Sequence, residues 1–219
     1  MIAAVLGMAM MLFACSKDVL RKSSMSIDTS AEPESVVSST VVNLIIYIVD
    51  SARPRDVVAR AADHVRNIFE DSCNLKIDTS IADVETSDLP GANPDGLNSV
   101  ALRMLTEDTA QQTLTPFRLF FISSTLENNT AFAYLPSANI VESGTAWVTS
   151  LVTEDCLPVI MAHETGHLLL DDAGHSSRRE NIMHHGCTST NFGSGYKTGE
   201  FNAEQCRQME ELQLLRSAG

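Results

Sequence analysis

The stretch with the most chemical potential in this sequence lies between residues 163 and 185, which hold five of the chain's six histidines. It begins with the HExxH pattern His163-Glu164-Thr165-Gly166-His167. On a helix, residues four apart share one face, so the two imidazoles of this pattern would point at a common spot. Such a pair binds Zn²⁺, and Glu164 beside the first histidine can deprotonate a metal-bound water. The residues therefore predict metal-assisted hydrolysis.

A catalytic zinc site needs a third protein ligand and an open position for water. His175 is the third ligand that we favour, since it adds another imidazole a short distance after the motif. Asp171, Asp172 and Glu180 are the alternatives. An aspartate in the last helical turn would have to swing under the metal, and Glu180 follows His167 at a short interval. The two aspartates otherwise accept hydrogen bonds from the ligands or are solvated turn residues.

Met183 and His185 extend this stretch beyond the candidate ligands. We expect Met183 to form an apolar floor beneath the zinc ligands, and simple core packing predicts nearly the same position for it. His185 has two interpretations. It either binds the metal or donates a hydrogen bond to an oxyanion, or it is a surface histidine.

These residues resemble the metzincin metalloproteases, whose signature is HExxHxxGxxH followed by a Met-turn. The resemblance covers residues 163–183. The interval from His175 to Met183 is similar to that of matrixin-like members, and Asn181-Ile182-Met183-His184-His185 resembles the astacin Met-turn Ser-Ile-Met-His-Tyr. Membership would imply a zincin-like fold and a zinc endopeptidase whose extended substrate pairs with an edge strand, here residues 131–135. It would also imply one catalytic Zn²⁺ on His163, His167 and His175, with Glu164 as general base.

The chain departs from the metzincin pattern after His167. The family places a glycine seven residues, and the third ligand ten residues, after the first histidine. Those positions are Leu170 and Ala173 here, and Gly174 and His175 follow them, so the connection is two residues longer. We expect the helix to continue through about Leu170 and the chain to reverse over residues 171–174, with Gly174 at a positive φ.

The flanking sequence predicts an α+β fold with an α/β-like N-terminal lobe. It would hold a twisted mixed sheet with an antiparallel edge strand, two long helices, and a small irregular C-terminal lobe ending in a helix. Apolar runs and alternation predict strands over 41–49, 75–81, 118–122, 131–135 and 145–149. Apolar periodicity predicts a helix over 54–69, and weaker features a helix over 98–112. Residues 89–96 are expected to form a loop, and Asn202-Ala-Glu-Gln205 a capping box that opens a helix to about Leu215.

The N-terminus predicts export. Residues 1–15 carry no charge and end in Leu12-Phe13-Ala14-Cys15, which resembles a bacterial lipobox. We interpret 1–15 as a signal peptide with lipidation at Cys15; a plain secretory signal and an uncleaved anchor are the alternatives. Residues 16–40 would be a flexible linker and 41–219 the catalytic domain, with subdomains 41–170 and 171–219. The expected location is the bacterial cell envelope, periplasmic or surface, or the medium.

Four cysteines remain if Cys15 carries a lipid. An even number in an exported chain predicts two disulfides. We favour Cys187–Cys206, because it would tie the loop after the site to the C-terminal helix, and this leaves Cys73–Cys156.

The whole sequence thus favours a zinc endopeptidase acting on proteins or peptides. The net charge of −13 argues against a nucleic-acid partner. We expect a monomer that meets the membrane only through its lipid, and no residue pattern indicates a structural Ca²⁺. The alternatives are an inactive metal- or protein-binding lipoprotein on the same scaffold, which would not need Glu164, and a zinc amidase acting on cell-wall peptides.

Overall fold

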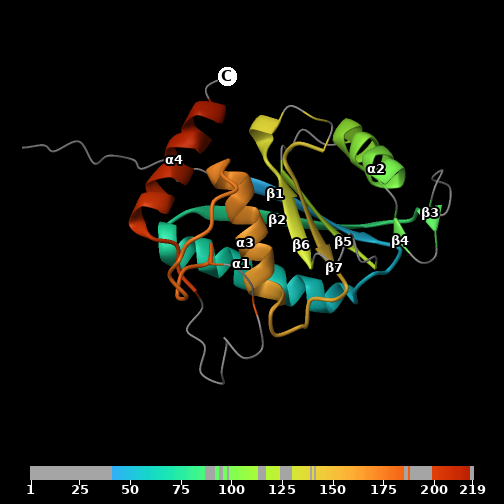
Figure 1. Ribbon diagram of the computed structural model, residues 1–219, viewed down its shortest axis with the longest axis horizontal. Coiled ribbons are helices and arrows are strands. Elements are labelled where there is room, and N and C mark those ends of the chain that lie inside the picture. The colour runs from blue at the N-terminus through green and yellow to red at the C-terminus, as the bar shows by residue number, and fades with distance from the viewer. Residues whose placement is uncertain are drawn as a thin grey trace, which may run out of the picture. The chain divides into compact units, whose positions relative to one another are not determined.

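The centre of the fold is a five-stranded sheet in the order β2-β1-β5-β7-β6 (Figure 1). β1, β2, β5 and β7 are parallel, and β6 pairs antiparallel with β7 at one edge. The computed structural model describes residues 41–86, 92–93, 96–97, 99–112, 117–123, 130–138, 140, 142–184, 187 and 199–217. The strands of the sheet are β1 (Val41–Val49), β2 (Lys76–Val84), β5 (Phe117–Ile122), β6 (Ala131–Tyr134) and β7 (Thr145–Thr149).

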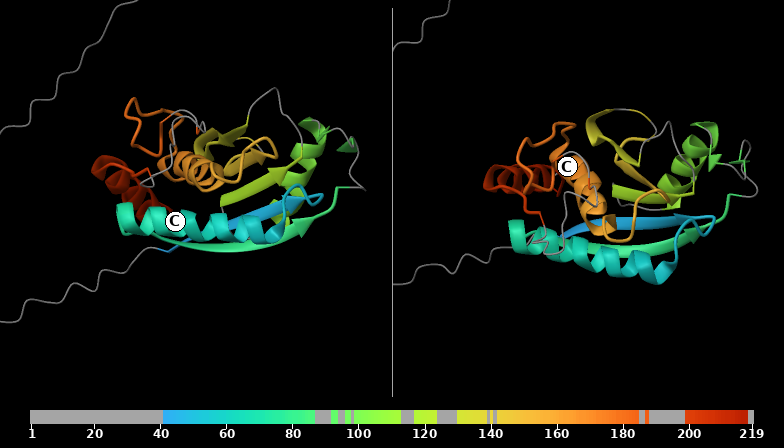
Figure 2. Two further views of the ribbon diagram at one scale, coloured as in Figure 1. Left: turned by 90° about the horizontal axis from the view of Figure 1, so that it is seen from below. Right: turned by 60° about the horizontal axis from the view of Figure 1, so that its bottom comes forward.

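The inner strands β5 and β7 are buried on both faces because helices cover both sides of the sheet. All residues of β5 and β7 are buried, as expected for inner strands of a largely parallel sheet. On one face the core includes α1 (Arg55–Cys73) and α3 (Leu157–Leu170). On the other, Leu105 of α2 (Ser99–Gln112) belongs to a smaller cluster with Phe120 and Trp147. Figure 2 shows α1 running alongside β1 and β2.

The last helix, α4 (Ala203–Ser217), packs against α3 and α1. Among the described residues between α3 and α4, the backbone pairing consists of two isolated bridges, Ser176 with His184 and Asn181 with Glu200. The expected α+β architecture, with its antiparallel edge strand and an irregular segment ending in a helix, is confirmed. In the described part of the chain, no helix combines the length and apolar character needed to cross a membrane.

The expectation of an unpaired loop over residues 89–96 was wrong in part. β3 (Ala92–Asn93) and β4 (Gly96–Leu97) form a two-stranded antiparallel ladder there. Turn-rich composition also suits a tight hairpin, and strands of two residues are too short for alternation to reveal them.

The four cysteines of the folded part form two disulfides, as expected, but the favoured pairing was wrong. The bonds are Cys73–Cys206 and Cys156–Cys187. Cys73 ends α1, which lies against the first turn of α4, and Cys156 is the N-cap of α3. Sequence order does not tell which helix ends meet in space, so the pairing could not be deduced from the positions of the cysteines.

Candidate metal centre

Three histidines converge beside α3. His163 and His167 project from one face of the helix, each only 6% exposed, and their Nε2 atoms lie 3.1 Å apart. His175 follows the helix and is exposed, and its Nε2 lies 3.3 Å from that of His167. These three are the one group of potential metal ligands found in the described part of the chain, and their ligand atoms lie within 4.8 Å of one another.

This geometry fits a tetrahedral zinc ion. A Zn–N bond of about 2.0–2.1 Å places two ligand nitrogens about 3.3 Å apart in a tetrahedron. The two Nε2 separations, 3.1 and 3.3 Å, agree with that edge. Three neutral imidazoles suit Zn²⁺, and they leave a fourth position open.

The Nδ1 atoms of the two helical histidines are held by main-chain carbonyls. His163 Nδ1 donates to the carbonyl oxygen of Ile182 at 2.7 Å, and His167 Nδ1 donates to that of Asp172 at 2.7 Å. Because a carbonyl oxygen only accepts, each ring carries its proton on Nδ1. Each Nε2 therefore presents its lone pair toward the centre of the cluster.

The unusual connection between His167 and His175 is built by two aspartates. α3 ends at Leu170, as expected, but the left-handed residue is Asp171, with φ of 51°. Gly174 does not have a positive φ, so that expectation was wrong. Aspartate tolerates the left-handed region, and the Asp172 carboxylate accepts the Gly174 N–H at 2.8 Å, which turns the chain toward His175.

The alternative third ligands are not in the cluster. The Asp171 carboxylate accepts the N–H of Ser137 at 3.0 Å, and the Asp172 carboxylate is in the turn described above. Glu180 is exposed and does not join the three histidines. Asp172 does support a histidine, but through its main-chain oxygen.

Glu164 is a buried carboxyl group, 5% exposed, next to the first histidine. Its Oε2 has no hydrogen-bond partner among the described residues. Burial raises the pKa of Glu164 to about 8 in the protein without metal. A buried carboxylate needs a compensating cation or donor, and a divalent cation held by the adjacent imidazoles would supply the charge.

Met183 packs against α3 at Gly166, which lies between the two helical histidines in sequence. It is 1% exposed, and a Cβ added to Gly166 would lie 2.6 Å from its Sδ. The structure thus shows Met183 buried against α3, and its role as a floor beneath the ligands stays a prediction. The close packing of Met183 on Gly166 was not predicted from the sequence, although a glycine inside a helix can indicate such packing. His185 lies outside the described residues.

Comparisons with known proteins support the fold and say less about the chemistry. No family model and no curated protein sequence matches the chain. Metalloproteinase-II from Bacteroides fragilis is similar in structure, with a TM-score of 0.56 at 17% identity over 82% of this chain. This chain spans about half of that protein, 55% of its length.

Two further solved structures are matched over nearly their full length. A zinc-dependent peptidase from Methanocorpusculum labreanum has a TM-score of 0.52 at 17% identity, covering 75% of this chain and 99% of its own. An archaemetzincin from Methanopyrus kandleri has a TM-score of 0.53 at 14% identity, covering 81% and 98%. The chain therefore has a zincin-like fold.

Proposed function

We propose that this chain is a zinc-dependent endopeptidase. The observation that carries the proposal is the convergence of His163, His167 and His175, with their ligand atoms within 4.8 Å of one another, beside the buried carboxyl group of Glu164. The Oε2 atom of that group has no hydrogen-bond partner among the described residues. The fold supports it, because solved structures with this fold include zinc-dependent peptidases.

The proposed roles follow from the geometry. His163, His167 and His175 hold the metal. A zinc ion there would lower the pKa of a water molecule and polarise the scissile carbonyl. Glu164 accepts the proton of the attacking water and passes it to the leaving amine.

The edge strand β6 is the proposed binding surface for the substrate backbone. It ends the sheet next to β7, so its outer edge is available to pair with an extended peptide. Ala131 and Ala133 belong to the side of β6 that packs with the core of α3. Asp171 and Ser137 join the end of α3 to the turn after β6. The substrate would therefore be held at a fixed distance from the histidines.

We further propose that Met183 belongs to a metzincin-type Met-turn and that the protein is an exported lipoprotein. The packing of Met183 beneath α3 is compatible with the first assignment. Two disulfides favour an oxidising compartment, as an exported chain would meet.

The test is a peptide-library digest by the purified chain, with and without a chelator, together with zinc analysis. We expect about one zinc per chain and cleavage that the chelator abolishes and added Zn²⁺ restores. Cleavage that survives complete removal of the metal would refute the proposal.

A further inference from the structure

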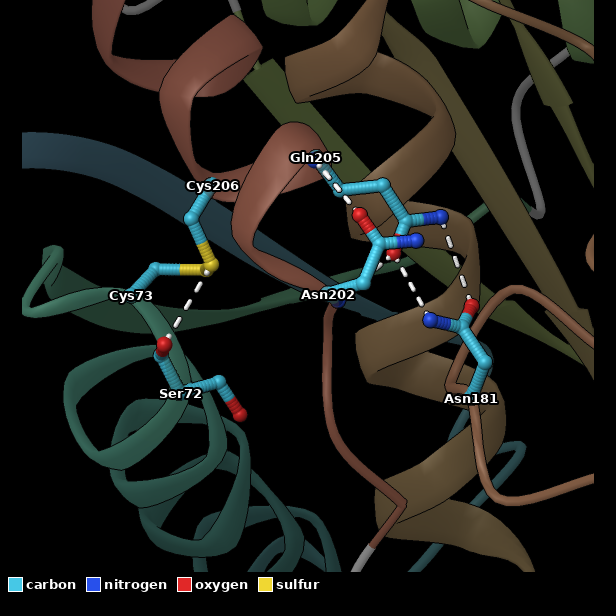
Figure 3. The surroundings of a disulfide bond; sticks show 6 residues. All are labelled: Ser72, Cys73, Asn181, Asn202, Gln205 and Cys206. Atoms are coloured by element: carbon cyan, nitrogen blue, oxygen red, sulfur yellow. Dashed lines mark hydrogen bonds between the residues drawn. A yellow bond between two sulfur atoms is a disulfide. The ribbon is translucent and has the colours of Figure 1, made fainter.

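A pair of side-chain amides lies behind the candidate metal centre. Asn181 is 8% exposed and Gln205 is partly buried. Asn181 Nδ2 donates to Gln205 Oε1 at 2.8 Å, and Gln205 Nε2 donates to Asn181 Oδ1 at 3.3 Å (Figure 3). The two residues thus bond reciprocally across 24 positions of sequence, and neither is a candidate ligand.

The orientation of Gln205 is fixed by the first turn of α4. Its main-chain N–H donates to Asn202 Oδ1 at 2.9 Å, and its Oε1 accepts the N–H of Asn202 at 2.9 Å, which is a reciprocal capping box. The next residue, Cys206, is bonded to Cys73 at the end of α1 (Figure 3). The side chain of Gln205 is therefore presented by a turn that is capped and covalently anchored.

The other end of the pair reaches a candidate ligand through a single peptide unit. Asn181 Oδ1 accepts the N–H of Met183 at 2.9 Å. The carbonyl group of the same peptide unit belongs to Ile182, and it accepts from His163 Nδ1 at 2.7 Å. In a planar trans peptide the N–H and C=O groups point in opposite directions. The hydrogen bond that holds the N–H of Met183 therefore also sets the direction of the Ile182 carbonyl group.

We propose that Asn181 and Gln205 are positioning residues for His163, so that the first turn of α4 takes part in metal binding without contributing a ligand. The proposal rests on the zinc site proposed above. In this proposal the amide pair sets the direction of the Ile182 carbonyl group, and that carbonyl sets the ring orientation and the tautomer of His163. Groups behind a ligand histidine commonly change metal affinity 10–100-fold.

A purely structural role is the competing interpretation, since breaking any buried amide pair lowers stability. Asn202→Ala is the matched control. It removes the cap of α4, a loss of about 1 kcal/mol, yet keeps the main-chain N–H that holds Gln205 Oε1. Stability should fall in Asn202→Ala and in Gln205→Ala alike.

Zinc affinity of the full chain, measured by competition with a chromogenic chelator, separates the two interpretations. We expect Gln205→Ala to bind zinc at least about tenfold more weakly than wild type and Asn202→Ala to stay within about twofold. Asn181→Asp, which keeps an oxygen for the Met183 N–H, should retain most of the affinity that Asn181→Leu loses. Equal affinities in Gln205→Ala and Asn202→Ala would overturn the proposal.

A second measurement does not depend on the zinc peptidase assignment. In protein freed of metal by a chelator, NMR of the imidazole Nδ1 proton of His163 reports its hydrogen bond to the Ile182 carbonyl. We expect that proton to exchange faster with solvent in Gln205→Ala than in Asn202→Ala. Equal exchange rates in the two variants would reject the positioning role even if the chain binds zinc. If the variants differ in exchange rate but the wild-type chain does not bind zinc, only the proposed function is rejected.

Discussion

Met183 and Gly166 are so close that a side chain at position 166 would require Met183 to move. An added Cβ would lie 2.6 Å from Met183 Sδ and 3.0 Å from Cε1 of Phe201, and both side chains are buried. Gly166 lies between the two histidines of α3 in sequence, so this contact lies next to the candidate metal centre.

Gly166→Ala should therefore destabilise the protein although it improves helix propensity. The propensity gain is about 1 kcal/mol, and overpacking a rigid core costs about 1–3 kcal/mol. We expect a net loss of up to about 2 kcal/mol in urea unfolding. In a Met183→Ala background the same change should become neutral or stabilising, because the methyl group enters vacated space. A cost that is the same in both backgrounds would show that the Met183 contact is not its cause.

Glu164→Gln should separate metal binding from catalysis. The substitution preserves shape but removes the proton acceptor, and the three histidines are untouched. General bases contribute about 10²–10⁴-fold to rate, so we expect a loss of that size in kcat with about one zinc per chain retained. Both quantities are measured on the same preparation, by peptide hydrolysis and by metal analysis. Full activity in the variant would contradict the role assigned to Glu164.

The pKa of Glu164 makes a prediction about the metal-free protein. Burial raises this pKa to about 8 from an ordinary value of 4.5. The folded state then binds a proton that the unfolded state releases, so this contribution to stability is complete below pH 4.5 and is lost as pH rises toward 8. The slope is at most about 1.4 kcal/mol per pH unit.

Urea unfolding in the presence of a chelator, between pH 5 and about 8, checks this pH dependence. Glu164→Gln is the control, because glutamine does not titrate. As the pH rises, the wild-type protein should lose unfolding free energy relative to Glu164→Gln. A constant difference would mean that Glu164 has an ordinary pKa.

Features encoded by neighbouring residues could be predicted from the sequence. The apolar run of β5 predicted a buried strand, the HExxH spacing placed His163 and His167 on one helical face, and Asn202 and Gln205 predicted a capping box. Each of these depends on contacts within a few residues, which local composition and periodicity record.

The features that were predicted wrongly or not at all depend mostly on which distant parts of the chain come together. The pairing of Cys73 with Cys206 joins residues 133 positions apart. The second partner of Gln205, Asn181, lies on another segment. The turn before His175 has a local cause, which is the left-handed conformation of Asp171. Glycine adopts that conformation more often than aspartate does, so the sequence pointed to Gly174 instead.

His175→Ala tests the third ligand, the residue that the unusual connection delivers. With two imidazoles left, we expect zinc affinity to fall at least about 100-fold, because each ligand contributes several kcal/mol to the binding of a structured zinc site. Glu180→Gln is the matched control: it removes the exposed rival ligand from the same segment and should keep zinc at the wild-type level. Chelator competition on the three proteins measures the difference. Normal zinc binding by His175→Ala, or its loss in Glu180→Gln, would show that the metal is held by a different set of residues.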